Sequence, residues 1–516
     1  MLRRRDEAEG SEASAVVGLS PSAVVGRPLR ADPSGRLLPG DPVLLRIGAG
    51  RIVDVTPLAA RDAVWDEPGG TLGDDQAVLL PAFADAHIHL MACAAGRAGV
   101  DLALEHPPTL ATLLAHLAAS AEAVSGAVWL RASGYDEAWL AERRHPLRME
   151  LDAAVARRPL RLRHATRHAS LLNSLAFARV EQALGRLGEE HAPRDAAGTP
   201  LGIVYGLEPE ITQVVGPLAE ATLRAALRCV GNELARLGVV HLDEVTASND
   251  AGRVARLATA VADGDLPQQL RVFVGDPDEA EPARRAAGGR VEIAGVKLLA
   301  RSTEEVCAPG FLDTLVRARR RGLPVAVHAV EADVIAGVLA ALEAAPPRHG
   351  GDVRVPDRLE HCSLCPPELV RRVAEAGVAV VTQPAFLAVR GAKYRAEVEP
   401  PLWPWLYPLR ALRAAGVLVA GGCDAPVVPF DPRLGLDGAT RRRAGDEMPL
   451  APEEALDDAA ALELFSVSAA RLRGARVAGL TAGAAADVLL AEPGSLRRGW
   501  RSLQVRRVLS AGRVIA

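Results

Sequence analysis

The stretch Pro81-Ala82-Phe83-Ala84-Asp85-Ala86-His87-Ile88-His89 carries more information about the folding of this 516-residue chain than any other. It predicts a buried strand whose end presents two histidines. Alternation along an extended chain lets His87 and His89 point the same way, so both can bind one metal ion. Neutral imidazoles suit zinc and, less specifically, iron, nickel or manganese. An isolated His-x-His arises often by chance, so its weight depends on what surrounds it.

Beyond this stretch, apolar runs of strand length recur through the middle of the chain. Most intervals between them carry helical patterns rich in Ala, Leu, Arg and Glu. Strands that alternate with helices in this way predict an α/β fold, here a (β/α)8 TIM-like barrel. The eight predicted strands span residues 79–85, 238–242, 270–274, 291–297, 324–328, 357–361, 377–382 and 417–422.

Polar residues end or follow most of these predicted strands. The active site of a (β/α)8 barrel lies at the carboxyl ends of its strands, so these side chains are expected to share one site. Alone, His328 or His361 would more often be a core or surface histidine, and Asp424 a cap or turn residue. The candidates at strand ends are His87, His89, His241, Asp243, Lys297, His328, His361 and Asp424.

Lysine is almost absent from this chain. Of 60 basic residues only Lys297 and Lys393 are lysines. Arginine supplies charge and hydrogen bonds as well or better, but it does not readily react with CO2 to form a carbamate. Lys297 ends the apolar run 291–297, and its neighbours favour a carboxylated lysine that bridges two metal ions. The alternative is that two lysines survive by chance.

The two ends of the chain resemble each other and differ from the middle. Short strand-like runs fill residues 1–80, including a predicted hairpin of 43–47 and 51–55, and similar runs fill 478–516. We therefore predict one small β-sandwich domain built from both ends, with the barrel spanning 81–477. The gap between the first two strands, 100–236, is too long for a plain crossover. It predicts an inserted, mostly helical subdomain that could cover the barrel mouth.

Composition excludes several classes of function. The net charge of -4, with both signs interspersed, gives no sign of a nucleic-acid groove or a basic membrane face. No apolar stretch reaches the ~18 residues of a membrane span, and Arg3-Arg4-Arg5 is followed by acidic residues rather than by the apolar segment of a secretory signal. Six scattered cysteines suit a reducing cytoplasm. Cys362-x-x-Cys365 has no second pair that would complete a structural zinc site, and we interpret Cys362 as a packing residue.

The chain resembles the amidohydrolase superfamily along most of its length, and within it amidohydrolase family 3, the subfamily that includes N-substituted formamide deformylase. The resemblance is specific because it spans both the predicted strand ends and the predicted insertion. It rests on the His-x-His strand and on Gly295-Val296-Lys297, Val325-Ala326-Val327-His328, Arg358-Leu359-Glu360-His361, Val381-Thr382-Gln383-Pro384, Gly422-Cys423-Asp424-Ala425-Pro426-Val427, Ser133-Gly134-Tyr135-Asp136-Glu137, Arg167-His168-Ala169-Ser170-Leu171-Leu172-Asn173-Ser174 and Gly198-Thr199-Pro200-Leu201-Gly202.

This resemblance implies a site with two metal ions, expected to be zinc. His87 and His89 would hold one ion with Asp424, His328 and His361 would hold the other, and carboxylated Lys297 would bridge both. The metals would lower the pKa of a shared water, and Asp424 would take its proton and pass it to the leaving amine.

Two further residues are candidates for contact with the substrate. His168, in the predicted insertion, is a candidate to contact the substrate or its oxyanion, with a structural role equally open. Lys393, in a predicted loop after the seventh strand, could meet an anionic substrate group or be a surface lysine. The resemblance also implies a small-molecule substrate and a possible homodimer.

Two segments depart from the subfamily pattern. Residues 298–302 replace an Asp-Gly-containing loop, and His328-Ala329-Val330-Glu331 replaces a run with a Gly-Asp pair. Glu331 leaves an alternative open, because His-x-x-Glu at this strand resembles deaminases that use one metal ion and a glutamate proton shuttle. Otherwise Glu331 begins the next helix, where a carboxylate suits the helix dipole. A noncatalytic scaffold is a third reading, which the full set of candidate ligands disfavours.

Overall fold

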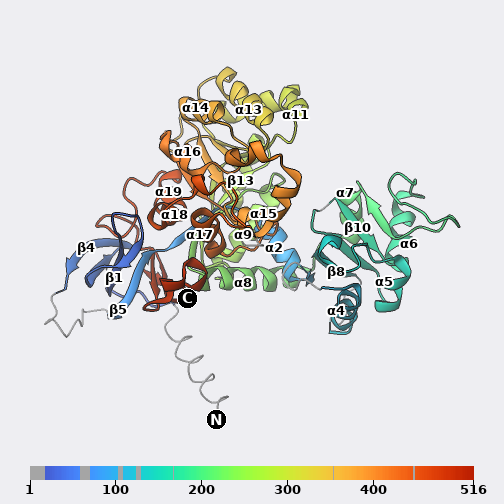
Figure 1. Cartoon of the computed structure of the whole chain (residues 1–516), viewed down its shortest axis with the longest axis horizontal. Helices are drawn as coiled ribbons and strands as arrows, with labels where there is room; N and C mark the ends of the chain where they lie inside the picture. Colours follow the sequence, from blue (N-terminus) through green and yellow to red (C-terminus); the bar gives the residue numbers. More distant parts are fainter. Residues whose placement is uncertain are drawn as a thin grey trace, which may run out of the picture. The chain divides into compact units, whose positions relative to one another are not determined.

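A computed structural model describes residues 18–58, 70–102, 108–123, 129–166, 168–352, 354–444 and 448–516. The chain forms two compact units, one comprising Leu90–Val230 and the other comprising Met1–His89 together with Gly231–Ala516 (Figure 1). No helix among the described residues is long and apolar enough to cross a membrane. The predictions that involve Arg3-Arg4-Arg5 and Arg167 lie outside the described residues.

The larger unit contains a parallel sheet of eight strands, which confirms the predicted (β/α)8 TIM-like fold. The strands neighbour one another in chain order, apart from the interruption by the inserted unit. The first predicted strand, 79–85, is split: residues 79–81 belong to a strand of a different sheet, and the barrel strand begins at Phe83. The barrel strands are β6 (Phe83–Ile88), β12 (Val239–Glu244), β13 (Gln269–Val274), β14 (Glu292–Leu299), β15 (Val325–Ala329), β16 (Arg358–His361), β17 (Ala379–Thr382) and β18 (Val419–Gly421).

Backbone hydrogen bonds at the carboxyl end of β6 close the ring. The N–H of Asp424, just after β18, donates to the carbonyl of His87 at 2.7 Å, and the N–H of His89 donates to the carbonyl of Ala425 at 3.0 Å. The first and last strands are thereby joined, which places the start and end of the barrel sequence in contact.

The helices that follow the strands each bury one apolar face. Helix α14 buries Leu369, Val370 and Val373 on one side, and α9 begins where Asp250 accepts a hydrogen bond from the N–H of Arg253. These helices include α9 (Ala251–Ala262), α10 (Ala280–Ala287), α11 (Thr303–Cys307), α12 (Pro309–Arg320), α13 (Ala332–Ala344), α14 (Pro367–Glu375), α15 (Ala385–Glu397), α16 (Leu409–Ala414), α17 (Pro432–Arg441), α18 (Asp458–Leu464) and α19 (Val467–Leu472), with α8 (Glu220–Arg236) preceding β12.

Both chain ends contribute to a second sheet, as predicted. Antiparallel pairing of Val488 with Pro81 joins the C-terminal strands to the N-terminal ones, which the blue and red ribbons of Figure 1 show side by side. The strands form one continuous hydrogen-bonded sheet whose apolar side chains pack mainly into one core, with Ala23, Val25 and Leu44 in a second, smaller cluster. They are β1 (Ala23–Ala31), β2 (Leu37–Pro39), β3 (Val43–Gly48), β4 (Arg51–Pro57), β5 (Thr71–Pro81), β19 (Val488–Ala491), β20 (Val505–Ser510) and β21 (Arg513–Val514), with β3 and β4 in the predicted hairpin.

The inserted unit contains a five-stranded sheet that the prediction of a mostly helical region missed. Its order is β11-β10-β9-β8-β7, with β7, β8 and β9 parallel. The alternation Leu160-Arg161-Leu162-Arg163 is typical of a half-buried strand and could have indicated β9. The strands are β7 (Val100–Asp101), β8 (Leu130–Tyr135), β9 (Leu160–His164), β10 (Ala169–Leu172) and β11 (Ile203–Tyr205), and the helices α2 (Leu90–Arg97), α4 (Leu110–Ala123), α5 (Arg148–Ala154), α6 (Ser174–Leu184) and α7 (Glu208–Val215).

Candidate metal centre

The six predicted ligands lie at or just beyond the carboxyl ends of five barrel strands. Each comes from a strand whose apolar residues are buried in the barrel, so the end of the strand fixes the position of its polar residue. His87 and His89 belong to the end of β6, Lys297 to β14, His328 to β15 and His361 to β16, and Asp424 follows β18.

Four histidines and one aspartate from this set form a connected cluster in which each side chain lies near at least one other. Ligand atoms of His87, His361 and Asp424 all lie within 4.8 Å of one another. The Oδ1 atom of Asp424 is 3.0 Å from Nε2 of His89 and 3.4 Å from Nε2 of His87. The ring centroids of His328 and His361 are 4.4 Å apart. The structure thus brings imidazoles and a carboxylate together as ligands for divalent metal ions.

Lys297 is buried beside this cluster. The residue is 3% exposed, and its Nζ atom has no hydrogen-bond partner among the described residues. Burial lowers the pKa of Lys297 to about 8. Burial, together with the charge of Lys297, also lowers the pKa of His328 to about 4. A buried ammonium without a partner is unfavourable, so this position fits a lysine that carries another group.

The ring nitrogens that face away from the cluster are held by other side chains. Nδ1 of His87 donates to the Glu360 carboxylate, and Nδ1 of His361 donates to Oε1 of Gln383 at 2.8 Å. Nδ1 of His89 is 2.9 Å from the hydroxyl of Thr246. Such contacts fix the tautomer and orientation of metal-binding histidines, so Nε2 is left for the metal. The ligand prediction did not include Glu360 or Thr246.

Glu360 belongs to a buried network of charges inside the barrel. Arg358 donates to Glu360 at 2.6 Å, to Asp243 at 2.7 Å and to the carbonyl of Ala86 at 3.0 Å. Burial alone would raise the pKa of Glu360, but the charges of Arg358, Lys297 and His87 hold it well below its usual value. Charged residues at alternate positions of an otherwise buried strand, as in Arg358-Leu359-Glu360, are the sequence signal that could have revealed this network.

Replacing Arg358 with methionine is expected to destabilise the protein by ~3–5 kcal/mol, because Glu360 would lose its main counter-charge inside the barrel. Denaturant unfolding measures the difference. Arg371→Met is the matched control, since its ion pair with Glu375 lies on an exposed helix surface and contributes less than about 1 kcal/mol. Equal losses in the two variants would contradict the assignment of Arg358 as the counter-charge of Glu360.

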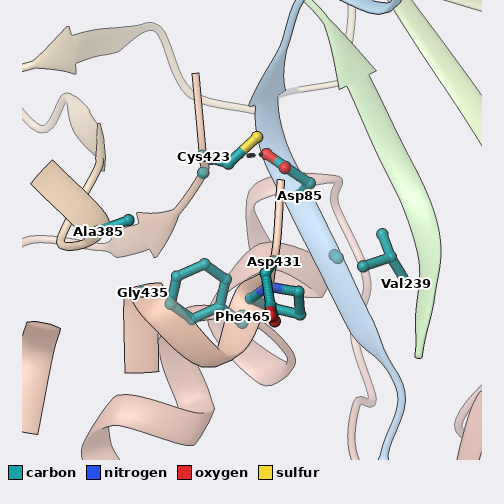
Figure 2. A pocket seen from close by; sticks show the side chains of 10 residues that line it. Asp85, Val239, Ala385, Cys423, Asp431, Gly435 and Phe465 are labelled. Carbon is teal, nitrogen blue, oxygen red and sulfur yellow. Dashed lines mark hydrogen bonds between the residues drawn. The ribbon is translucent and has the colours of Figure 1, made fainter. Parts of the chain in front are cut away.

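Asp85 forms hydrogen bonds with both chain segments that carry His87 and Asp424. One carboxylate oxygen, Oδ1, accepts hydrogen bonds from the N–H groups of His87 and Cys423, each at 3.0 Å. Figure 2 shows Asp85 beside Cys423. Burial raises the pKa of Asp85 to about 6. Two of the candidate metal ligands also occupy left-handed backbone conformations, His361 at φ 71° and Asp424 at φ 60°. Such strain at strand ends is typical of functional positions.

Gly422→Ala is expected to weaken metal binding by roughly 10–100-fold, the range seen when groups supporting metal ligands are changed. A Cβ at this position would lie 2.6 Å from Cβ of His87, so the ligand strand would have to move. Equilibrium dialysis against zinc measures the change. Gly310→Ala should bind as the wild type does, because a Cβ there meets nothing within 4 Å. Unchanged affinity in Gly422→Ala would show that the strand accommodates the methyl group.

The cavity drawn in Figure 2 lies beside these supporting residues. It is lined by Asp85, Cys423 and Phe465 among others, and its volume is about 10 Å³, room for about one water molecule. Ligand pockets for small molecules occupy several hundred cubic ångströms. This cavity is therefore part of the packing around β6 and β18 and does not hold a substrate.

Other candidate residues have different surroundings. His241 lies 2.7 Å from Asp487, and Asp243 belongs to the charge network. Glu331 is exposed at the N-cap of α13, where its side chain makes no capping bond. Lys393 lies in helix α15 rather than in the predicted loop, half-exposed and 3.7 Å from Glu397. His168 is exposed just before β10 in the inserted unit.

A (β/α)8 barrel with imidazole and carboxylate ligands at its carboxyl face defines the class of metal-dependent barrel hydrolases. The family model for the amidohydrolase family matches residues 75–516. The chain belongs to the amidohydrolase family and is a hydrolase of carbon–nitrogen bonds.

Two sequence relatives and one solved structure are similar to the chain. YtcJ of Bacillus subtilis strain 168, whose name assigns it to the amidohydrolases, is 26% identical over 72% of this chain and 74% of its own length. N-substituted formamide deformylase of Arthrobacter pascens is 25% identical over 90% of this chain and 92% of its own. A metal-dependent hydrolase of Pyrococcus horikoshii OT3 shares the fold, with a TM-score of 0.70 and 21% identity over 91% of this chain and 97% of its own.

Proposed function

We propose that the chain is a binuclear amidohydrolase in which Lys297, carboxylated by CO2, bridges two zinc ions. The observation that carries this proposal is the buried Nζ atom of Lys297, which has no partner among the described residues and whose charge acts on His87, His328 and His361. A carbamate would turn this unpartnered cation into an anionic ligand. It would also explain why lysine persists at this position in a chain that otherwise uses arginine.

The division of the ligands between the two ions follows the family resemblance. His87, His89 and Asp424 would hold one ion, and His328 and His361 the other, with Lys297 shared. Bound zinc supplies a Lewis acid and lowers the pKa of water to near neutrality. Asp424 Oδ1, which contacts two imidazoles, is placed to accept a proton from the attacking water and to return it to the leaving nitrogen. Glu360 and Gln383 hold the imidazoles in position throughout.

The proposed substrate is a small molecule with an amide or formamide-like C–N bond. The name of the deformylase relative from Arthrobacter pascens supports this class. Residues 298–302 and the inserted unit would select the particular substrate, and His168, Glu331 and Lys393 stay candidates for contacting it. A cytoplasmic location is supported by six free cysteines. We also propose that the protein forms a homodimer and binds neither nucleic acid nor membrane.

The alternative function is a mononuclear aminohydrolase that deaminates an amidine-like or heterocyclic substrate, with Glu331 as proton shuttle. That reaction needs no lysine ligand, so it leaves the buried Lys297 unexplained. Its product also differs, because deamination releases ammonia.

The products of the reaction distinguish the two functions. Zinc-loaded protein, supplied with bicarbonate, is incubated with a panel of N-formyl and N-acyl amines and a panel of amino-substituted heterocycles. Release of a primary amine together with formate or another carboxylate is expected, with the bond between carbonyl carbon and nitrogen broken by water. Ammonia release from the second panel alone would overturn the proposal in favour of the deaminase.

A further inference from the structure

We propose that the inserted unit holds a second divalent metal site, formed by Asp136, Glu137, His145 and His164 and suited to zinc. These residues follow the carboxyl ends of two adjacent parallel strands. In the register of β8 and β9, Tyr135 pairs with His164, so Asp136 and Glu137 emerge directly beside His164. The carboxyl ends of neighbouring parallel strands are a common place for ligands in α/β proteins.

The donor atoms of this cluster are close enough to share one ion. Ligand atoms of Asp136, Glu137 and His164 all lie within 4.8 Å of one another. Nε2 of His164 is 2.7 Å from Oε2 of Glu137 and 3.8 Å from Oδ1 of Asp136, and Nδ1 of His145 is 3.5 Å from the same Glu137 oxygen. Two imidazoles and two carboxylates make a donor set that zinc accepts in tetrahedral geometry.

Neighbouring groups form hydrogen bonds with the side chains of the cluster, as they do around metal ligands in other proteins. Nδ1 of His164 is 2.7 Å from the hydroxyl of Thr166, which leaves Nε2 facing the carboxylates. The buried hydroxyl of Tyr135 is 2.9 Å from Nδ1 of His145, and Asp136 accepts from the N–H of Ala138 at 2.9 Å. Asp136 and His164 are thus each held by a neighbour outside the cluster, whereas Nδ1 of His145 would exchange its contact with Tyr135 for the ion.

The two carboxylates of the cluster favour binding of a cation. Among the described residues, histidines supply the only ion partners of Asp136 and Glu137, although elsewhere in this arginine-rich chain many carboxylates pair with arginine. Two adjacent carboxylates without an arginine or lysine partner carry a charge that one divalent ion would neutralise.

Zinc binding by the full chain tests this site separately from the barrel. Zinc per chain is measured by equilibrium dialysis and elemental mass spectrometry for wild type and for Glu137→Gln/His164→Asn. The double variant is expected to bind one equivalent less than wild type. The matched control Glu181→Gln/His191→Asn alters a partly buried glutamate and histidine of the same unit that lie outside the cluster, and should bind as wild type does.

A complementary variant removes the barrel ligands instead. His87→Asn/His89→Asn/His328→Asn/His361→Asn should still bind one zinc ion, and that ion should disappear when Glu137→Gln/His164→Asn is added. If the first double variant does not fold, as judged by circular dichroism, His145→Gln replaces it, with weaker binding of one equivalent expected. Equal zinc stoichiometry and affinity in wild type and the insertion variants would overturn the proposal and leave the cluster as a hydrogen-bonded group only.

Discussion

Lys297→Ala is expected to reduce turnover by roughly 10³-fold or more, since it removes the group that would bridge both metal ions and with it several kcal/mol of stabilisation of the transition state. The steady-state rate of amine release at saturating zinc and bicarbonate measures this. Lys297→Arg should be as inactive as Lys297→Ala, because arginine keeps the positive charge but does not form the carbamate.

Comparing the turnover of Lys297→Ala with that of Lys297→Arg distinguishes carbamate formation from the presence of a buried positive charge. If Lys297 served only as a buried cation, Lys297→Arg would retain much of the activity. Arg371→Ala, a substitution on an exposed helix surface, controls for the general effect of mutation. Turnover retained in Lys297→Ala would contradict the bridging role and favour the one-metal deaminase.

Asp424→Asn is expected to lower kcat by ~10²–10⁴-fold, the usual effect of removing a general acid–base group. Asparagine has nearly the same size, but its amide neither accepts the proton nor matches a carboxylate as a zinc ligand. The rate is measured at several zinc concentrations, so that a loss of metal is separated from a loss of proton transfer.

A nearby aspartate provides the control for this second variant. Asp431 caps helix α17 through the N–H of Arg433 and makes none of the contacts of the metal cluster. Asp431→Asn should therefore leave kcat unchanged. A kcat for Asp424→Asn equal to that of Asp431→Asn at saturating zinc would contradict the assigned role of Asp424 in proton transfer.

The barrel was predictable because its strands are continuous apolar runs of the right length and spacing. The predicted strands 291–297 and 324–328 correspond to β14 (Glu292–Leu299) and β15 (Val325–Ala329), whose interiors are largely buried and which carry Lys297 and His328 near their carboxyl ends. The ligand set followed from one topological rule, that the carboxyl ends of parallel strands meet at one face. Hence His87 and Asp424 were expected to share a site although they are far apart in sequence.

The supporting residues could not be derived in the same way. Whether Glu360 faces His87 depends on the register of β16 against its neighbours β15 and β17. A single sequence does not encode that register locally. Arg358 and Asp243 are tolerated in the core because their opposite charges compensate each other. This compensation depends on the pair, so neither residue alone reveals it. Lys393 was misplaced in a loop because the helix α15 follows β17 almost directly.

The central claim is the carbamate on Lys297, and carbon NMR tests it most directly. Zinc-loaded protein is equilibrated with isotopically labelled bicarbonate and compared with Lys297→Met prepared in the same way. We predict a carbamate resonance in the wild type that is absent from the variant and lost when a chelator removes the zinc. Identical spectra for the two proteins, with zinc bound in the barrel of both, would contradict the bridged two-metal centre.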